Sequence, residues 1–308
     1  MIQRKLQGQR NLGKNLGCLE MERELPPVCI PSYKRPELLV EKTLGFLARE
    51  GYPVHLIHVY VASEEQKELY ESIVPWYMVG SIRVGVLGLS NQRNFIRDSW
   101  PEGQILLQMD DDVRGVKTLD GEDFLGLVRR GLQALQVTGL WGILPTDDGR
   151  RLKADSTHHL THIVGAFFMA RNHKDICMTT NDVEDYERSI LYFLKYGTVC
   201  RYRGAGVATE FWAGDGGLQG PERESRRATE LERLVATYPT ACSKIQKPKM
   251  IDIRLNWRFV PSSLHIAPLP SVAPSPCSGS SRPGQSHAAG QTSCNGWEEL
   301  LDSLASAK

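Results

Sequence analysis

The stretch ILLQMDDDV, residues 105–113, decides the fold of this chain. Residues 105–109 form an apolar run of strand type, and Asp110, Asp111 and Asp112 follow it directly. Adjacent carboxylates repel each other, so three in a row need a compensating positive charge. We expect the run to be a buried strand whose carboxyl end projects these acids into a ligand crevice.

Strand and helix patterns alternate on both sides of this stretch. Strands are expected at 28–32, 54–61, 81–88, 104–109, 140–145 and 162–170, and helices at 36–50, 63–73, 91–100, 120–139 and 179–197. This alternation predicts an α/β fold, with a doubly wound, mostly parallel sheet and flanking helices.

Composition divides the chain into three parts. Residues 1–25 are basic and polar, and we interpret them as a flexible extension without the apolar core of a secretory signal. Residues 26–260 are predicted to form one globular domain. Residues 261–308 are rich in Pro, Ser and Gly and are predicted to be disordered. A short helix near their end is either a docking helix or only marginally stable.

Charge and cysteine content narrow the class of protein. The net charge of +1 argues against a general polyanion binder. The seven cysteines form no CxxC pair, which favours reduced thiols and a cytoplasmic or nuclear setting. No run approaches the ~20 apolar residues of a membrane-spanning helix.

The first and third acids of the cluster are candidates for a metal site. Asp110 and Asp112 point the same way if the strand geometry continues. Carboxylate pairs suit Mg²⁺ or Mn²⁺, which often bind phosphate oxygens as well. Such a site fits a nucleotide diphosphate leaving group. The alternative is a solvated acidic turn.

A second acidic pair, Glu184 and Asp185, lies in TTNDVEDYERSI at an expected helix start. Helix capping alone explains acids at this position. Together with the first cluster, the pair also fits a general base that removes a proton from an acceptor hydroxyl, and we favour Asp185 in that role.

Other motifs carry weaker signals. Arg93 and Asn94 in SNQRN suit a nucleotide or sugar contact, or simply a polar helix start. His158, His159 and His162 lack the glutamate of a zinc HExxH motif, so we expect loop or acceptor-pocket residues. Residues 221–258 contain nine Lys/Arg against five Asp/Glu, which suits a nucleic-acid acceptor or a solvated charged face.

The motifs PSYKRP, NQRN, MDDDV, VEDYE and GGLQ, in this order over 26–258, resemble glycosyltransferases of the GT-A fold. Within that fold the chain looks like the group associated with thymine and cytosine methyl oxidases, which includes the base J glucosyltransferase. The resemblance implies Asp110 and Asp112 as metal ligands and Asp185 as base, with Glu184 as substitute or sugar contact. It implies that these further residues bind the donor: Pro31, Ser32, Arg35, Arg93, Asn94, Asp110, Asp111, Gly216 and Gly217.

The function implied is a metal-dependent inverting glycosyltransferase, using Mn²⁺ or Mg²⁺. It would move a sugar from a UDP-sugar to the hydroxyl of a 5-hydroxymethylpyrimidine in DNA, with the tail binding a protein partner. One departure from the family concerns the late histidine that often completes the metal site, since no histidine lies between His173 and His265. The alternatives are a protein or glycan acceptor, and a catalytically inactive nucleotide-sugar-binding module.

Overall fold

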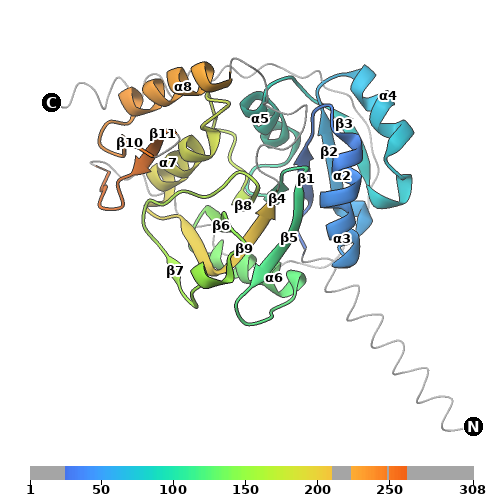
Figure 1. Ribbon diagram of the computed structural model, residues 1–308, viewed down its shortest axis with the longest axis horizontal. Coiled ribbons are helices and arrows are strands. Elements are labelled where there is room, and N and C mark those ends of the chain that lie inside the picture. Colours follow the sequence, from blue (N-terminus) through green and yellow to red (C-terminus); the bar gives the residue numbers. More distant parts are fainter. Residues whose placement is uncertain (1–24, 210–222, 248–249, 262–308) are drawn as a thin grey trace, which may run out of the picture.

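The computed structural model describes residues 25–209, 223–247 and 250–261 (Figure 1). The expected N-terminal extension apart from Leu25, the expected tail apart from Pro261, and the glycine-rich loop with Gly216 and Gly217 lie outside the described residues, and so does the short helix expected near the end of the tail. The division of the chain into three parts therefore stays a prediction.

A nine-stranded sheet forms the centre of the molecule. Its order is β3-β2-β1-β4-β8-β6-β9-β5, with β7 paired to β9. From the pairings, six strands (β1–β4, β6 and β9) run in one direction and three in the other. The predicted mostly parallel α/β sheet is thus confirmed. The strands are β1 Val28–Pro31, β2 Ile57–Val61, β3 Ser81–Val84, β4 Ile105–Met109, β5 Val113–Thr118, β6 Leu140–Leu144, β7 Ser156–Thr157, β8 Phe167–Arg171 and β9 Cys200–Thr209.

Helices flank the sheet near most of the expected positions. They are α2 Pro36–Leu39, a π-helical segment Val40–Leu44, α3 Gly45–Arg49, α4 Glu64–Ile73, α5 Leu89–Ser99, α6 Phe124–Ala134, α7 Glu184–Tyr196 and α8 Arg223–Thr237, with 3₁₀ turns at Val54–Leu56, Trp76–Met78 and Gly149–Arg151. Ser63 caps α4 by accepting from Gln66 N, and Gly197 ends α7 in the left-handed conformation. None of the described helices is long and apolar enough to cross a membrane.

The two faces of the sheet are covered by different helices. Alternate residues of a strand point to opposite faces. Phe167 and Met169 of β8 therefore share one core with residues of α2, α3 and α6. Phe168 and Ala170 face the other way and pack in a core with α7. The same alternation at Leu106 of β4 places α5 on this second face.

The structure differs from the expected pattern in several places, and the strands β5, β7 and β9 of the sheet were not expected. The apolar run 162–170 becomes strand β8 only from Phe167, and β8 runs antiparallel between β4 and β6. A buried strand reads as a continuous apolar run in either direction, so sequence does not fix its orientation. Residues Val54–Leu56 form a 3₁₀ turn instead of beginning β2.

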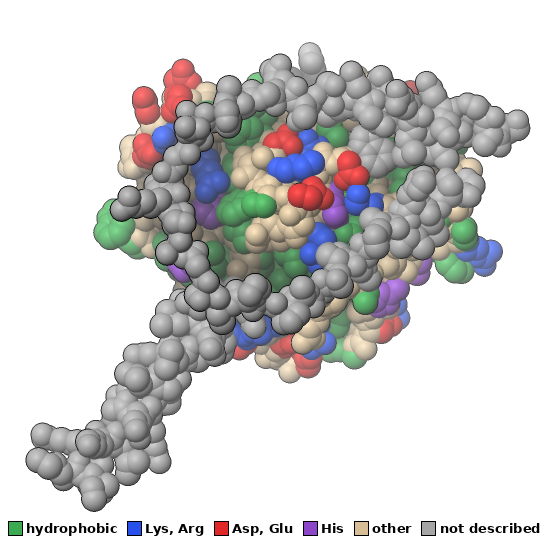
Figure 2. All heavy atoms as spheres, turned by 180° about the vertical axis from the view of Figure 1, so that it is seen from behind, with side chains coloured by type: hydrophobic (Ala, Val, Ile, Leu, Met, Phe, Trp, Pro, Cys, Tyr) green, Lys and Arg blue, Asp and Glu red, His purple; other side chains and the backbone are tan. Residues whose placement is uncertain are grey.

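Part of the second face of the sheet is covered by a layer that shares one core with Phe168 and Ala170. Helices α7 and α8 and the hairpin β10 Cys242–Gln246 with β11 Ile251–Leu255 lie together there, whereas α2, α3 and α4 lie beside β1–β3 (Figure 1). Acidic and basic side chains are interspersed on the face seen in Figure 2. Within the described part of the chain, Cys29, Cys200 and Cys242 form no disulfide.

Candidate functional site

A cavity of about 330 Å³ opens at the carboxyl ends of β1, β2, β3 and β4. This edge of an open α/β sheet is where ligands bind, because the loops there diverge. Each strand contributes the residues that follow it, and the segments before β8 and α7 close the opposite side. The lining comprises Pro31–Tyr33, Arg35, Ala62, Val86–Leu89, Gln92, Asp110–Asp112, Val164–Ala166, Asn181, Asp182, Glu184, Asp185 and Arg223.

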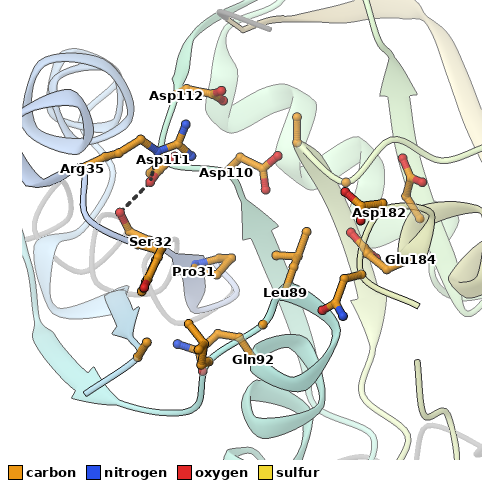
Figure 3. Close-up of a pocket in the computed structure, with 18 of the residues that line it drawn as sticks. Pro31, Ser32, Arg35, Leu89, Gln92, Asp110, Asp111, Asp112, Asp182 and Glu184 are labelled. Atoms are coloured by element: carbon orange, nitrogen blue, oxygen red, sulfur yellow. Dashed lines mark hydrogen bonds and ion pairs between the residues drawn. The ribbon is translucent and has the colours of Figure 1, made fainter. Parts of the chain in front are cut away.

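The middle acid of the cluster is tied to the first strand. Asp111 is 1% exposed and accepts hydrogen bonds from Ser32 Oγ at 2.6 Å and Arg35 Nε at 3.3 Å. Figure 3 shows Asp111 directed toward Ser32 and Arg35. Burial raises the pKa of Asp111 to about 6, although Arg35 and Ser32 oppose that rise. Asp111 therefore holds the segment after β1 against the segment after β4.

Asp110 lies on the other side of the turn and is held by Arg93. Arg93 Nη2 donates to Asp110 Oδ1 at 2.7 Å, and the Asp110 side chain is 32% exposed to the cavity. Thr43, in the π-helical segment, donates from its hydroxyl to the Asp110 carbonyl at 2.8 Å and accepts from Val113 N at 3.0 Å. Thr43 thus fixes the backbone at both ends of the acidic turn.

Asp112 has the least satisfied carboxylate of the three. Its Oδ1 atom is buried and has no hydrogen-bond partner among the described residues. Burial, followed by the charges of Asp110 and Asp111, raises the pKa of Asp112 to about 7. A divalent cation bound here would offset both the burial of this negative charge and its repulsion by Asp110 and Asp111.

The chemistry of Asp110 and Asp112 therefore fits a hard divalent cation with oxygen ligands. Within the described ranges, no group of three or more His, Cys, Asp or Glu side chains is placed to hold a metal. The two carboxylates alone would leave most coordination positions to other oxygens. Diphosphate and water oxygens commonly fill such positions around Mg²⁺.

Asp185 lines the cavity from the first turn of α7. Its Oδ2 atom is 2.7 Å from Nε2 of His162, and its Oδ1 atom accepts from Tyr186 N at 2.9 Å. The His162 ring stacks on Tyr186, with centroids 4.1 Å apart. Burial opposes ionisation, but His162 and Arg188 outweigh it and lower the pKa of Asp185 to about 2. Asp185 is thus a fixed, ionised carboxylate facing the cavity.

The negative charge of Glu184 is compensated by two buried arginines. It forms an ion pair with Arg188, one helical turn on, and its Oε1 lies 3.9 Å from Arg93 Nε. Arg93 also donates to Gln108 and to the carbonyl of Gly165. This buried network connects the acidic turn after β4 with the start of α7, which are the two sides of the cavity.

Most of the predicted site residues meet in one place. Pro31, Ser32, Arg35, Asp110–Asp112, Glu184 and Asp185 all line the cavity. Arg93 does not line it: the residue is fully buried and acts through Asp110.

Asn94 also lies outside the lining, contrary to the expected donor contact. Its amide donates to the Met178 carbonyl at 2.7 Å and accepts from Met178 N at 3.0 Å. Gln92 is the last residue of α5 that lines the cavity, and successive helix residues point about 100° apart, so Asn94 points about 200° away from it. Asn94 instead anchors the segment before α7.

The sequence did not indicate the contacts of two residues that shape the site. His162 was expected as a loop or acceptor-pocket residue of an HHxxH run, but no local spacing links it to Asp185, which is 23 residues away. Thr43 stands in an ordinary amphipathic helix pattern, and its hydroxyl gives no signal of the acidic turn that it contacts.

No protein-family model and no curated protein matches the chain. Among solved structures, it is similar to the mannosyltransferase PcManGT from Pyrobaculum calidifontis in complex with GDP-Man and Mn²⁺, with 14% identity, a TM-score of 0.42 and coverage of 69% of this chain and 63% of that one. It is also similar to 4-diphosphocytidyl-2C-methyl-D-erythritol synthase from Anaerococcus prevotii DSM 20548, with 8% identity, a TM-score of 0.40 and coverage of 68% and 98%. These likenesses concern the fold and say nothing of what this chain binds.

Proposed function

We propose that this protein is an inverting glycosyltransferase that uses a UDP-sugar. The observation that supports it is the placement of two kinds of carboxylate across one cavity. Asp110 and Asp112 line the cavity from the end of β4, and the ionised Asp185 lines it from the start of α7. Leaving-group departure and acceptor activation need such groups on opposite sides of the transferred sugar.

The donor's nucleotide binds, in this proposal, against the segments after β1 and β3. Pro31, Ser32 and Arg35 line the cavity on one side, and Val86–Leu89 add an apolar surface. A cavity of about 330 Å³ lies within the usual range for small-molecule sites. Arg35 is partly exposed, so its guanidinium is available both to Asp111 and to a phosphate.

Asp110 and Asp112 would hold Mn²⁺ or Mg²⁺ together with the diphosphate oxygens. When bound, the cation supplies charge neutralisation for the departing diphosphate. Arg93 keeps Asp110 in its orientation, and Thr43 fixes the backbone on both sides of the acids.

Asp185 takes the proton of the acceptor hydroxyl. The acceptor oxygen forms a bond to the anomeric carbon while the bond from that carbon to the diphosphate oxygen breaks. Attack from the face opposite the leaving group inverts the anomeric centre. His162 donates its hydrogen bond to Asp185 and so keeps the carboxylate facing the cavity.

The acceptor we propose is the hydroxymethyl group of a 5-hydroxymethylpyrimidine in DNA. The residues at 221–258 that gave a basic excess in the sequence are partly neutralised in the fold, for example by Arg227–Asp252 and Lys244–Glu232. The positive charge that supports a DNA acceptor is therefore limited to the surroundings of Arg201 and Arg258. A base paired in a duplex has to leave the stack to reach a cavity of this kind.

Mass spectrometry tests this function. The protein is incubated with a panel of UDP-sugars, Mn²⁺ and DNA that contains hydroxymethylcytosine or hydroxymethyluracil, and the DNA is digested to nucleosides. A nucleoside that gains the mass of a hexose or an N-acetylhexosamine supports the proposal. The Asp185→Asn variant should bind UDP but transfer no sugar. Donor hydrolysis without any gain on DNA would show a glycosyltransferase with another acceptor.

A further inference from the structure

A second cleft, of about 560 Å³, lies beside the cavity. It is bounded by the loop before β8, the first turn of α7, β9 and the end of the hairpin β10–β11. Its lining comprises His159, Leu160, Thr161, His162, Tyr186, Arg201, Ile253, Leu255 and Trp257. The function proposed above assigns no role to this cleft.

One hydrogen-bonded pair of side chains separates the cavity from the second cleft. His162 lines the second cleft and Asp185 lines the cavity, and their side chains are 2.7 Å apart. Both side chains are about one-fifth exposed, so neither is sealed from solvent. A molecule seated in the second cleft can therefore present a hydroxyl to Asp185.

The aromatic residues of the cleft provide surfaces for a planar ring. Trp257 is 57% exposed, and its ring lies 5.9 Å from that of His159. Tyr186 and His162, which also line the cleft, form a stacked pair. Exposed aromatic side chains of this kind stack on nucleobases regardless of base identity.

The charge of the cleft is positive and incompletely compensated. Among the described residues, the lining contains no carboxylate, although Asp185 is hydrogen-bonded to His162 and Asp252 to Tyr186 behind it. Arg201 uses Nη1 to donate to the His162 carbonyl, but its buried Nε has no partner among the described residues. Burial and the nearby Arg203 lower the pKa of Arg201, so an anion here would be stabilised. Arg258 adds an exposed guanidinium over the Trp257 ring, 4.6 Å from its centroid.

We propose that this second cleft binds the nucleotide that carries the acceptor hydroxyl. Its base stacks on Trp257, and a flanking phosphate pairs with Arg201 and Arg258. The inference rests on the function proposed above, since it places the acceptor of that same reaction. A neutral glycan would use the aromatic surfaces but would leave the two guanidinium groups without an anion.

Binding measured without any sugar donor tests this site separately from catalysis. The probe is a fluorescein-labelled, short single-stranded oligonucleotide with one 5-hydroxymethylcytosine, followed by anisotropy. Trp257→Ala and Arg201→Gln should each weaken binding by about 10-fold or more, as expected for loss of a stacking or phosphate contact. The matched control is Trp76→Ala, because Trp76 is 84% exposed and lines neither hollow. Binding of UDP with Mn²⁺, measured by calorimetry on the same proteins, should not change.

Photocrosslinking identifies the contact without relying on variants that fold poorly. An oligonucleotide with 5-bromouracil in place of the modified base should crosslink to peptides that contain Trp257 or Tyr186. Crosslinks confined to other peptides would overturn the inference. So would an oligonucleotide that does not bind the wild-type protein, or one that binds Trp257→Ala and Arg201→Gln as tightly as the wild type. A neutral oligosaccharide that binds the wild-type protein and binds Trp257→Ala more weakly, in the absence of any oligonucleotide binding, would assign the cleft to a glycan. Failure of UDP to bind the wild-type protein would instead count against the proposed function.

Discussion

His162 and Asp185 form a hydrogen-bonded pair in which Nε2 and Oδ2 are 2.7 Å apart, and each residue faces a different hollow. The pair fixes the carboxylate that the proposed reaction uses as base. Asp185 also has a lowered pKa, so it is ionised throughout the neutral range. A base of low pKa accepts a proton weakly, and its position therefore matters more than its intrinsic strength.

Replacing either member of the pair should slow the chemical step. Asp185→Asn should reduce kcat by about 10²–10⁴-fold, the usual contribution of a general base. His162→Ala should reduce kcat by roughly 10-fold with little change in KM for the donor, because it frees the carboxylate without altering the nucleotide site. His162→Gln, whose amide can donate to Asp185, should recover part of the loss. An unchanged kcat in His162→Ala would contradict the positioning role.

The raised pKa of Asp112 predicts a pH-dependent stability of the metal-free protein. Its folded pKa of about 7 lies above the ordinary carboxyl value of about 4, so the fold favours the neutral form. The stability that this group contributes is full below about pH 4 and is lost as pH rises through about 7. Asp112→Asn should thus stabilise the metal-free protein at about pH 8, on the order of 2 kcal/mol.

Thermal unfolding with and without Mn²⁺ and UDP measures this effect. The wild type should gain stability from the additions and Asp112→Asn should gain little, because the variant lacks one of the proposed ligands. Asp147→Asn, at an exposed ion pair with Arg114, is the control and should behave as the wild type does. A variant that responds to Mn²⁺ like the wild type would exclude Asp112 as a ligand.

Arg93 should contribute more to folding than an ordinary surface arginine. It is fully buried and donates to Asp110, Gln108 and Gly165. Arg93→Met would remove that donor from all three acceptors and would leave Glu184 with Arg188 as its one remaining positive partner among the described residues, at a cost of about 3–5 kcal/mol. Urea unfolding checks this, with Arg114→Met at the exposed pair as the control, expected to change by less than about 1 kcal/mol. Equal effects in the two variants would contradict the network.

Asn94 offers the converse test, because it was expected at the donor and lies elsewhere. Asn94→Ala removes both hydrogen bonds to Met178 and should cost about 1–3 kcal/mol of stability. The Kd for UDP with Mn²⁺ should stay within about 2-fold of the wild-type value when measured well below the unfolding transition. A large loss of UDP affinity in a fully folded variant would return Asn94 to the donor site.

The order of elements from β1 to β4 was readable from local patterns, whereas the strands β5, β7 and β9 were not predicted. The acidic turn after Met109, the cap at Ser63 and the glycine that ends α7 at Gly197 all obey rules that operate over a few residues. The direction of β8 was not readable, since a strand buried on both faces looks alike in either orientation.

The sequence by itself determined that three acids follow a buried strand and that a second acidic pair begins a later helix. Only the tertiary structure decided that Asp111 turns to Ser32 and Arg35, that Arg93 is a buried support, and that Asp185 is paired with His162. The physical reason is the distance along the chain over which each interaction acts. Capping and strand patterns depend on neighbours along the chain, whereas the partner of a carboxylate is whichever side chain the packed sheet and helices bring within hydrogen-bond distance.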